Sequence, residues 1–308
     1  MTQLAVSLPG LQMSNPVMPA SGTFGFGELY LDLFDYNNLG AMVLKSTTKK
    51  ARTGNEAPRF YSLKNGAMNA VGLKNPGVDA VVADKLPQLA NYSTPVIGSV
   101  AGETEDEFVE VAEKLSQSNI ISALELNLSC PNVKEGGLTF GVKPESVERI
   151  TRNVKQKVDV PVYVKLTPNV TDIVEIAKAA EAGGADGISL INTVLSMKID
   201  VVSKKPVLGN TMGGLSGEGI FPIAIRMVYQ VSQAVSIPVI GMGGVQSADD
   251  VIQMLLAGAS AVAVGTATYK NPLAMNEIIA DLPERMRELK ISSIEELIQE
   301  VKEGRVNG

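Results

Sequence analysis

The chain has 308 residues, and its hydrophobic content of 45% is enough for a sizeable core, which must be mainly aliphatic because aromatic residues are few. The net charge of −6 and the pI near 5.0 argue against a nucleic-acid-binding surface, which needs a basic footprint. The single cysteine excludes an internal disulfide and an iron–sulfur cluster held by this chain alone, and histidine is absent.

Short runs rich in Val, Ile and Ala recur along the chain, and each is followed by Gly, Ser or Asn and then by a helical pattern. They predict strands at residues 16–20, 41–45, 96–100, 123–128, 162–166, 187–191, 238–241 and 261–264. Helices are predicted at residues 105–116, 144–158, 170–182 and 248–257. This order is typical of an α/β fold of the (β/α)8 (TIM) barrel type, so we predict one barrel domain over residues 1–308. An open doubly wound sheet has less support, because no strand is followed by G-x-G-x-x-G.

Three predicted connections are unusual. Residues 46–79 and 192–217 are longer than a plain barrel needs, and residues 129–143 are rich in Gly and Pro. All three leave the carboxyl ends of strands, where barrel enzymes place their chemistry, so we expect binding loops, with residues 129–143 as an active-site lid. Near the chain end, Ser293 and Glu296 predict a capping box that opens a short helix in the tail at 290–308.

Polar groups gather at the predicted strand ends. Lys45 and Lys165 each terminate an aliphatic strand. One such lysine can extend to solvent, but two at equivalent ends of one barrel favour an anionic ligand. Gly243-Gly244 and Gly265-Thr266 follow the last two strands, where barrels often bind phosphate. Together they predict a phosphate-bearing cofactor over the barrel mouth.

The strand at residues 123–128 runs into Ser129-Cys130-Pro131-Asn132, which a strand cannot continue through. Two amides, of Asn127 and Asn132, and the only thiol therefore cluster where a strand ends. A lone cysteine is usually a small buried hydrophobic residue. The polar strand ends around this one favour a reactive thiol near Lys165 and Asn127.

On these residues the chain resembles a class 1 dihydroorotate dehydrogenase along nearly its whole length. The matching motifs are Pro19-Ala20-Ser21-Gly22, Leu44-Lys45-Ser46, Asn69-Ala70-Val71-Gly72-Leu73, Asn127-Leu128-Ser129-Cys130-Pro131-Asn132, Val164-Lys165-Leu166, Asn192-Thr193, Gly214-Leu215-Ser216-Gly217, Gly241-Met242-Gly243-Gly244 and Val264-Gly265-Thr266. The continuation of the third motif to Gly77, and Lys205-Pro206-Val207-Leu208-Gly209-Asn210, resemble the 1B branch. That branch uses NAD and works beside an electron-transfer subunit carrying FAD and a 2Fe–2S cluster.

The resemblance implies a role for each matching residue. Cys130 would be the catalytic base, and Lys165 would stabilise negative charge on the reduced flavin. FMN would be bound by Ser21, Lys45, Ser46, Ser99, Asn127, Lys165, Ile191, Gly217, Gly243, Gly244, Gly265 and Thr266. Dihydroorotate would be bound by Lys45, Asn69, Ala70, Val71, Gly72, Leu73, Asn127, Asn192 and Thr193. The family often has Asn in place of Ser99, and the acidic Glu218 is unexpected at its position.

The expected reaction is oxidation of dihydroorotate to orotate in pyrimidine synthesis, with one FMN per chain and no metal site. FAD and the 2Fe–2S cluster are expected only on the partner subunit, with a homodimer of this chain inside a hetero-oligomer. The alternatives are fumarate as acceptor, as in the 1A branch, and a non-catalytic barrel subunit. A barrel acting on RNA uridines is disfavoured by the acidic charge. No apolar run reaches membrane-spanning length and residues 1–4 lack signal-peptide features, so we expect a cytoplasmic protein.

Overall fold

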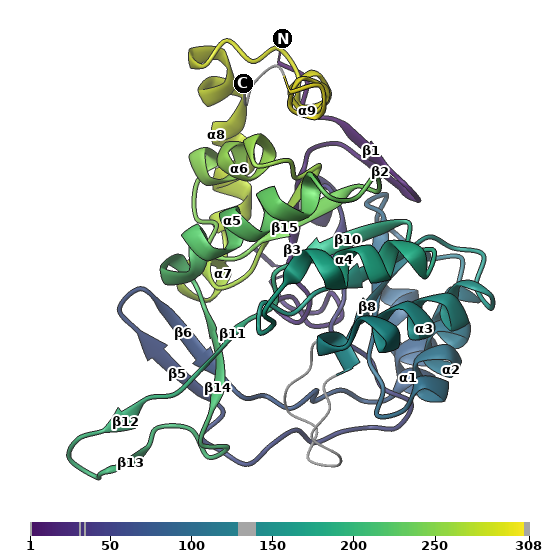
Figure 1. Cartoon of the computed structure of the whole chain (residues 1–308), viewed down its shortest axis with the longest axis vertical. Coiled ribbons are helices and arrows are strands. Elements are labelled where there is room, and N and C mark those ends of the chain that lie inside the picture. Colours follow the sequence, from purple (N-terminus) through teal and green to yellow (C-terminus); the bar gives the residue numbers. More distant parts are fainter. Residues whose placement is uncertain (1, 31, 34, 129–139, 305–308) are drawn as a thin grey trace.

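Eight parallel strands form a nearly closed barrel at the centre of the molecule (Figure 1). The computed structural model describes residues 2–30, 32–33, 35–128 and 140–304. Around the barrel the order is β3, β16, β15, β10, β9, β8, β7 and β4. Gly40 N, just before β4, donates to Val17 O of β3 at 2.8 Å. The strands are β3 (Val17–Pro19), β4 (Met42–Val43), β7 (Val96–Val100), β8 (Ile121–Asn127), β9 (Val162–Lys165), β10 (Gly187–Leu190), β15 (Val239–Met242) and β16 (Ala261–Val264).

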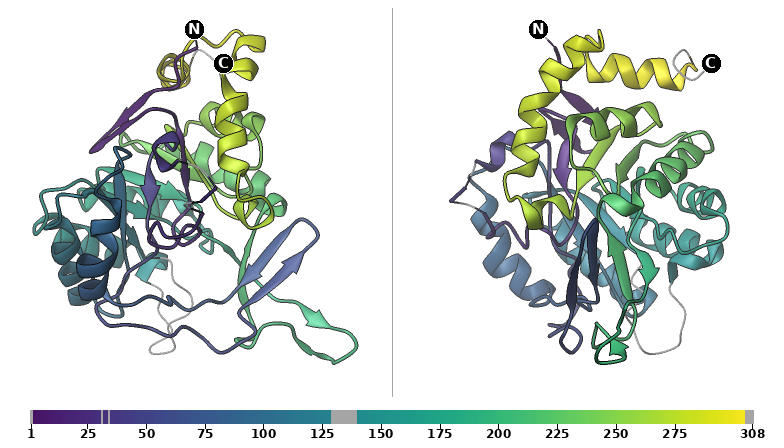
Figure 2. Two further views of the ribbon diagram at one scale, coloured as in Figure 1. Left: turned by 180° about the vertical axis from the view of Figure 1, so that it is seen from behind. Right: turned by 90° about the vertical axis from the view of Figure 1, so that its left-hand side faces the viewer.

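Helices pack around the outside of this barrel (Figures 1 and 2). They are α1 (Val78–Ala80), continued by helical stretches at Val81–Lys85 and Leu86–Leu89, α2 (Glu105–Ser116), α3 (Pro144–Lys155), α4 (Ile173–Ala182), α5 (Phe221–Ser232), α6 (Ala248–Leu256), α7 (Ala267–Lys270) and α8 (Ala274–Glu288). The predicted (β/α)8 barrel is therefore confirmed.

Side-chain capping and apolar spacing explain where these helices begin and what they bury. Thr104 caps α2 by accepting a hydrogen bond from Glu107 N, and Phe108 and Val111 are among the residues that this helix buries against the barrel. Asp172 caps α4 by accepting from Val174 N, so this helix begins three residues later than predicted. The core is mainly aliphatic, as the composition predicted.

The first strand–helix unit departs from the repeating pattern. Between β3 and β4 the described residues contain only one helical turn, Tyr36–Asn38. Gly22, Gly25 and Gly27 all have positive φ there, which an α-helix cannot accommodate. Around these glycines the chain instead makes successive turns.

The two long connections form regular structure that the sequence did not predict. They contribute β5 (Phe60–Leu63), β6 (Gly66–Asn69), β11 (Val194–Ser196) and β14 (Gly213–Ser216) to an antiparallel sheet in the order β11, β14, β6, β5. A hairpin of β12 (Ile199–Asp200) and β13 (Lys205–Pro206) projects from it (Figure 1). This small sheet stands beside the carboxyl ends of the barrel strands.

The opposite end of the molecule carries the N-terminal hairpin and both chain ends (Figures 1 and 2). The hairpin pairs β1 (Val6–Leu8) with β2 (Leu11–Met13), and the buried Tyr163 hydroxyl of β9 donates to Pro9 O at 2.8 Å. It therefore covers the amino ends of the barrel strands. No helix in the described ranges is both long and apolar enough to cross a membrane.

The predicted tail helix is present as α9 (Ile294–Lys302). Ser293 Oγ accepts a hydrogen bond from Glu296 N, as expected for its N-cap. The second half of the predicted capping box differs, because the Glu296 carboxylate contacts the Ser292 hydroxyl. Ile294, Leu297 and Val301 join the main core, so this helix packs on the barrel rather than standing apart.

Candidate active site

A cavity opens at the carboxyl ends of the barrel strands, between the barrel and the small sheet. Its empty volume is about 1260 Å³, part of which is open to solvent. Strand ends, the loops after them and the small sheet all contribute to its wall. The predicted site residues that line it are Ser21, Lys45, Ser46, Asn69, Val71, Gly72, Leu73, Asn127, Lys165, Ile191, Asn192, Thr193, Gly217, Gly243, Gly244, Gly265 and Thr266.

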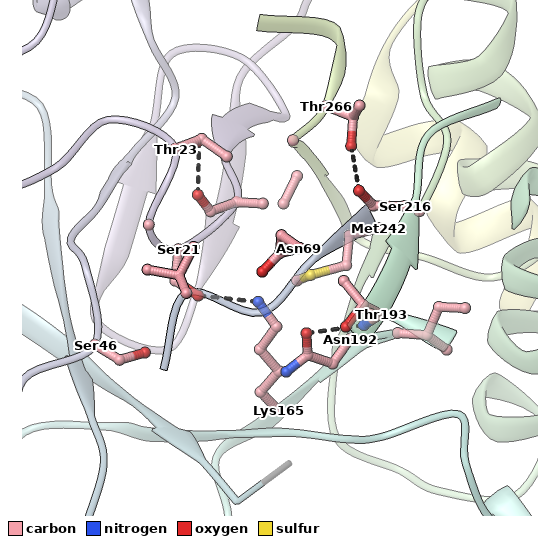
Figure 3. A pocket seen from close by; sticks show the side chains of 18 of the residues that line it. Ser21, Thr23, Ser46, Asn69, Lys165, Asn192, Thr193, Ser216, Met242 and Thr266 are labelled. Atoms are coloured by element: carbon pink, nitrogen blue, oxygen red, sulfur yellow. Dashed lines mark hydrogen bonds between the residues drawn. The ribbon is translucent and has the colours of Figure 1, made fainter. Parts of the chain in front are cut away.

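Lys165 lies at the centre of the cavity floor (Figure 3). Its side chain is buried, and Nζ donates to Ser21 Oγ at 3.0 Å. The carboxylate of Glu125, also buried, lies below it with Oε1 3.9 Å from Nζ. Glu125 Oε2 accepts a hydrogen bond from Ser189 Oγ at 2.8 Å. An ammonium and a carboxylate thus share the water-poor interior of the barrel directly beneath the cavity.

A chain of amides and hydroxyls runs across the adjacent wall. Asn127 Nδ2 donates to Ser46 Oγ at 2.9 Å, and Asn192 Nδ2 donates to Asn127 Oδ1 at 3.3 Å. Asn192 Oδ1 in turn accepts from Thr193 N at 2.8 Å (Figure 3). These bonds fix the orientation of two amides, and amides present both donors and acceptors to a ligand.

The ammonium of Lys45 makes no hydrogen bond or salt bridge within the described part of the chain. Burial is the main cause that lowers its pKa, the positive charge of Lys74 lowers that pKa further, and the Glu28 carboxylate opposes both by raising it. A half-buried cation that makes no salt bridge can bind an anion. This supports the interpretation that the strand-end lysines face a ligand.

The glycine pairs have a structural explanation that the sequence did not reveal. Gly243 and Gly244 have φ values of 126° and 84°, and a Cβ on Gly244 would lie 2.7 Å from the Cβ of Phe221 in α5. Backbone conformation and helix packing alone therefore require glycine there. At Gly265 a Cβ would meet nothing closer than 3.5 Å, and the residue faces the cavity. The open space above Gly265 has room for a ligand group.

Two of the predicted site residues that the structure describes, Ser99 and Ala70, do not line the cavity. Ser99 is fully buried and its Oγ lies 2.9 Å from Ser46 Oγ, so it supports Ser46 from behind. Ala70 packs with Met68 and Leu208 in a small cluster under the antiparallel sheet, because side chains alternate beyond β6. Cys130 lies outside the described residues, as does most of the predicted lid.

The structure also adds residues that sequence reasoning missed. Glu125 sits two positions before Asn127 on β8, so period-two alternation turns both side chains into the barrel. Ser216 accepts a hydrogen bond from Thr266 Oγ1 at 2.8 Å (Figure 3). Phe60 and Tyr269 line the cavity opening, with ring centroids 5.8 Å apart. A charged residue at an inward-facing position of a barrel strand is the sequence signal that identifies Glu125 as a candidate site residue.

The donor set fits FMN on structural grounds. Lys45 supplies a cation without a close partner, Lys165 a buried one, and the open space beside Gly265 and Thr266 offers room for a phosphate. The wall between them carries amide and hydroxyl donors of the kind a flavin ring accepts hydrogen bonds from.

Comparison with known proteins gives concordant results. The family model of dihydroorotate dehydrogenase matches residues 3–286. The chain is 55% identical over 298 residues to "Dihydroorotate dehydrogenase B (NAD(+)), catalytic subunit" of Shouchella clausii, covering 97% of this chain and 98% of that protein. It is also 55% identical over 305 residues to "Dihydroorotate dehydrogenase A (fumarate)" of Lactobacillus helveticus, covering 98% and 99%. Relatives of equal identity are thus named for two different electron acceptors, NAD and fumarate.

Proposed function

The chain belongs to the dihydroorotate dehydrogenase family, as a class 1 member and an oxidoreductase, and from that membership we propose that it oxidises (S)-dihydroorotate to orotate with FMN in the cavity described above. The observation that carries the proposal is the convergence of Lys45, Asn127 and Lys165, from three different strand ends, on one cavity. Each supplies a group that an anionic, carbonyl-rich substrate or a flavin requires.

Bound in this cavity, FMN would supply the acceptor for the hydride that leaves C6 of dihydroorotate. The Lys165 ammonium would face the flavin and stabilise negative charge that develops there, an electrostatic role that is often the largest contribution to catalysis. Its hydrogen bond to Ser21 holds the ammonium at one place on the cavity floor.

The asparagines would orient the pyrimidine ring. Asn127 and Asn192 are already fixed by hydrogen bonds to each other and to Ser46, so little side-chain freedom is lost when a ligand binds. Asn69, Val71, Gly72 and Leu73 form the facing wall, and the substrate carboxylate would lie against Lys45. Ala70 would act through the packing of this turn, since its side chain points away from the cavity.

Cys130 would remove the proton from C5. A thiol has a reference pKa of about 8.5, close enough to neutrality for a modest shift to make it a base. The chain has no histidine, which leaves this thiol as the group best suited to the task.

The proposed acceptor is NAD, reached through a partner subunit that carries FAD and a 2Fe–2S cluster. The 1B-like residues 69–77 and 205–210 support this choice. A partner is then needed, because a chain with a single cysteine cannot hold a 2Fe–2S cluster. Fumarate as the electron acceptor is the second candidate, because a relative with the same sequence identity, 55%, is named as a fumarate enzyme.

The direct experiment is anaerobic mixing of the purified, FMN-loaded chain with dihydroorotate. We expect the oxidised flavin absorbance to bleach and orotate to form in equal amount. A flavin that stays oxidised with dihydroorotate, yet bleaches with dithionite, would contradict the proposed substrate. A chain that retains no FMN after reconstitution would contradict the proposed cofactor.

Replacing Lys45 should weaken orotate binding. In Lys45→Met we expect the dissociation constant to rise roughly 10- to 100-fold, the value of a charge-assisted hydrogen bond. In the wild type, binding should weaken as pH rises through the lowered pKa of Lys45, because only the ammonium form, present below that pKa, attracts the carboxylate. Orotate titration of the bound-flavin spectrum across pH measures both effects.

Two further lysines make this test specific. Lys74→Met removes the neighbouring charge that lowers the pKa of Lys45, so the alkaline loss of binding should move to higher pH. Lys49→Met is the control, since Lys49 pairs with Glu110 on the outer surface. Unchanged orotate binding in Lys45→Met would show that the Lys45 side chain extends to solvent and does not bind the substrate carboxylate.

A further inference from the structure

The buried carboxylate of Glu125 has no role in the reaction proposed above. Only about 5% of its side chain is exposed, as is that of Lys165, and Oε1 lies 3.9 Å from Lys165 Nζ. Oε2 is satisfied by Ser189, whereas Oε1 has no hydrogen-bond partner within the described residues. A charged group is rarely left buried with half its acceptors unused, because desolvation is costly.

We propose that Glu125 is a positioning residue of this site, whose carboxylate holds the Lys165 ammonium in place at the cavity floor and offsets its charge beneath the flavin. The inference rests on the proposed function only in that FMN is the ligand above Lys165. The two charges together are neutral, so the carboxylate also moderates how strongly the ammonium attracts electrons into a bound flavin.

The register of the strands supports this pairing. Asn127 of β8 is the neighbour of Lys165 of β9, and Lys165 is the neighbour of Ser189 of β10. Glu125 therefore lies one inward layer below Asn127 on β8, and its side chain reaches past β9, which carries Lys165, to Ser189 of β10. Glu125 is held from one side by Ser189, which leaves its other oxygen directed toward the ammonium. The Ser21 hydrogen bond then directs the ammonium across the floor.

Few other ionisable groups face this pair. Those that line the cavity or the small void beneath it are Lys45 from the end of β4, Tyr163 from β9 and Tyr269 from α7. Tyr163 donates its hydroxyl to Pro9 O, and burial raises its pKa, so it stays neutral. The described parts of β3, β7, β10, β15 and β16 present only uncharged side chains to the same space. Glu125 is thus the only carboxylate among these lining residues.

Glu125→Gln tests the proposal because it removes the charge and keeps an acceptor for Ser189. The measurement is the midpoint potential of bound FMN, titrated with dithionite at one pH. It is made in the wild type, Glu125→Gln, Lys165→Met and the double variant. With Lys165 present, loss of the carboxylate should raise the potential, because the ammonium is no longer drawn away from the flavin.

In the Lys165→Met background the same change should raise the potential less, because no ammonium is left for the carboxylate to hold. A shift that is equal in both backgrounds would overturn the proposal. Asp186→Asn is the matched control: it removes a carboxylate 2.6 Å from Lys155 outside the barrel and should leave the potential unchanged.

A second readout needs no flavin. In the apoprotein, Glu125→Gln should lower the denaturant midpoint, and adding Lys165→Met should restore part of the loss, because the unpaired buried charge is then gone. A further loss in the double variant would contradict the pairing. Neither readout uses dihydroorotate, so a failure of the proposed substrate would be recognised separately in the wild type.

Discussion

Cys130→Ser should lose flavin reduction by dihydroorotate while retaining FMN and orotate binding. A hydroxyl is a much weaker acid than a thiol, so its basic form is scarce near neutral pH, and a positioned general base contributes on the order of 10²–10⁴-fold to a rate. We expect a loss in that range at neutral pH. Stopped-flow bleaching of the flavin under anaerobic conditions measures it directly.

The pH dependence separates loss of the base from a general disturbance. Part of the lost rate should return at alkaline pH in Cys130→Ser, since more of the hydroxyl is then ionised. Orotate affinity serves as the control, because the residues proposed to hold the ring are unchanged. Near-normal bleaching by this variant at neutral pH would show that Cys130 is not the base.

The barrel could be predicted from sequence because its strands are short, buried and aliphatic. Val96–Val100 is buried at every position, and its predicted and observed bounds agree. Helix bounds depend on caps: Thr104 predicts the start of α2 correctly, whereas Asp172 caps α4, which therefore begins at Ile173 and not at the predicted residue 170. Local signals of this kind are available in a single sequence.

The small antiparallel sheet could not be predicted in the same way. Its strands are short and half of them are glycine-rich, and its central pairing joins Ala67 of β6 to Ser216 of β14, far apart in the chain. Gly66 is required there because a Cβ would lie 2.1 Å from Ser216 O. Such close non-local contacts leave no periodic pattern for a sequence to display.

The candidate site was largely predictable because parallel strands end together. Lys45, Asn127 and Lys165 were assigned to strand ends, and all three line one cavity. Ser99 was assigned to a flavin contact, and only the structure shows that Ser46 stands between it and the cavity. The pairing of Glu125 with Lys165 could not be predicted, because the two residues lie on different strands and a charge pair across strands has no characteristic sequence spacing.

The exposed part of the small sheet bears on what the chain binds besides substrate. Val201 and Val202, in the turn of the β12–β13 hairpin, are 83% and 87% exposed, and Leu195 and Met197, which precede the hairpin, are about half exposed. We call residues 195–206 the apolar arm. Apolar side chains gathered on a projecting arm are typical of a protein contact. The arm therefore supports the expectation that the chain assembles with a protein partner.

Turnover with NAD as the electron acceptor should depend on a second subunit. We expect the isolated chain to reduce its flavin with dihydroorotate but to turn over poorly with NAD. No predicted strand is followed by G-x-G-x-x-G, and the single cysteine cannot hold a 2Fe–2S relay. Steady-state NADH formation by the FMN-loaded chain, with and without an added FAD and 2Fe–2S subunit, is the measurement.

Adding that subunit should restore NAD turnover and leave the rate of flavin bleaching by dihydroorotate nearly unchanged, because the first half-reaction uses only residues of this chain. Fumarate is the comparison in both mixtures, since a relative of equal identity carries the fumarate name. Efficient NAD reduction by the chain alone would refute the need for a partner. Rapid reoxidation by fumarate, with NAD inactive even in the presence of the partner, would assign the chain to the 1A branch. The exposed Val201 and Val202 of the apolar arm would then have to contact a different protein.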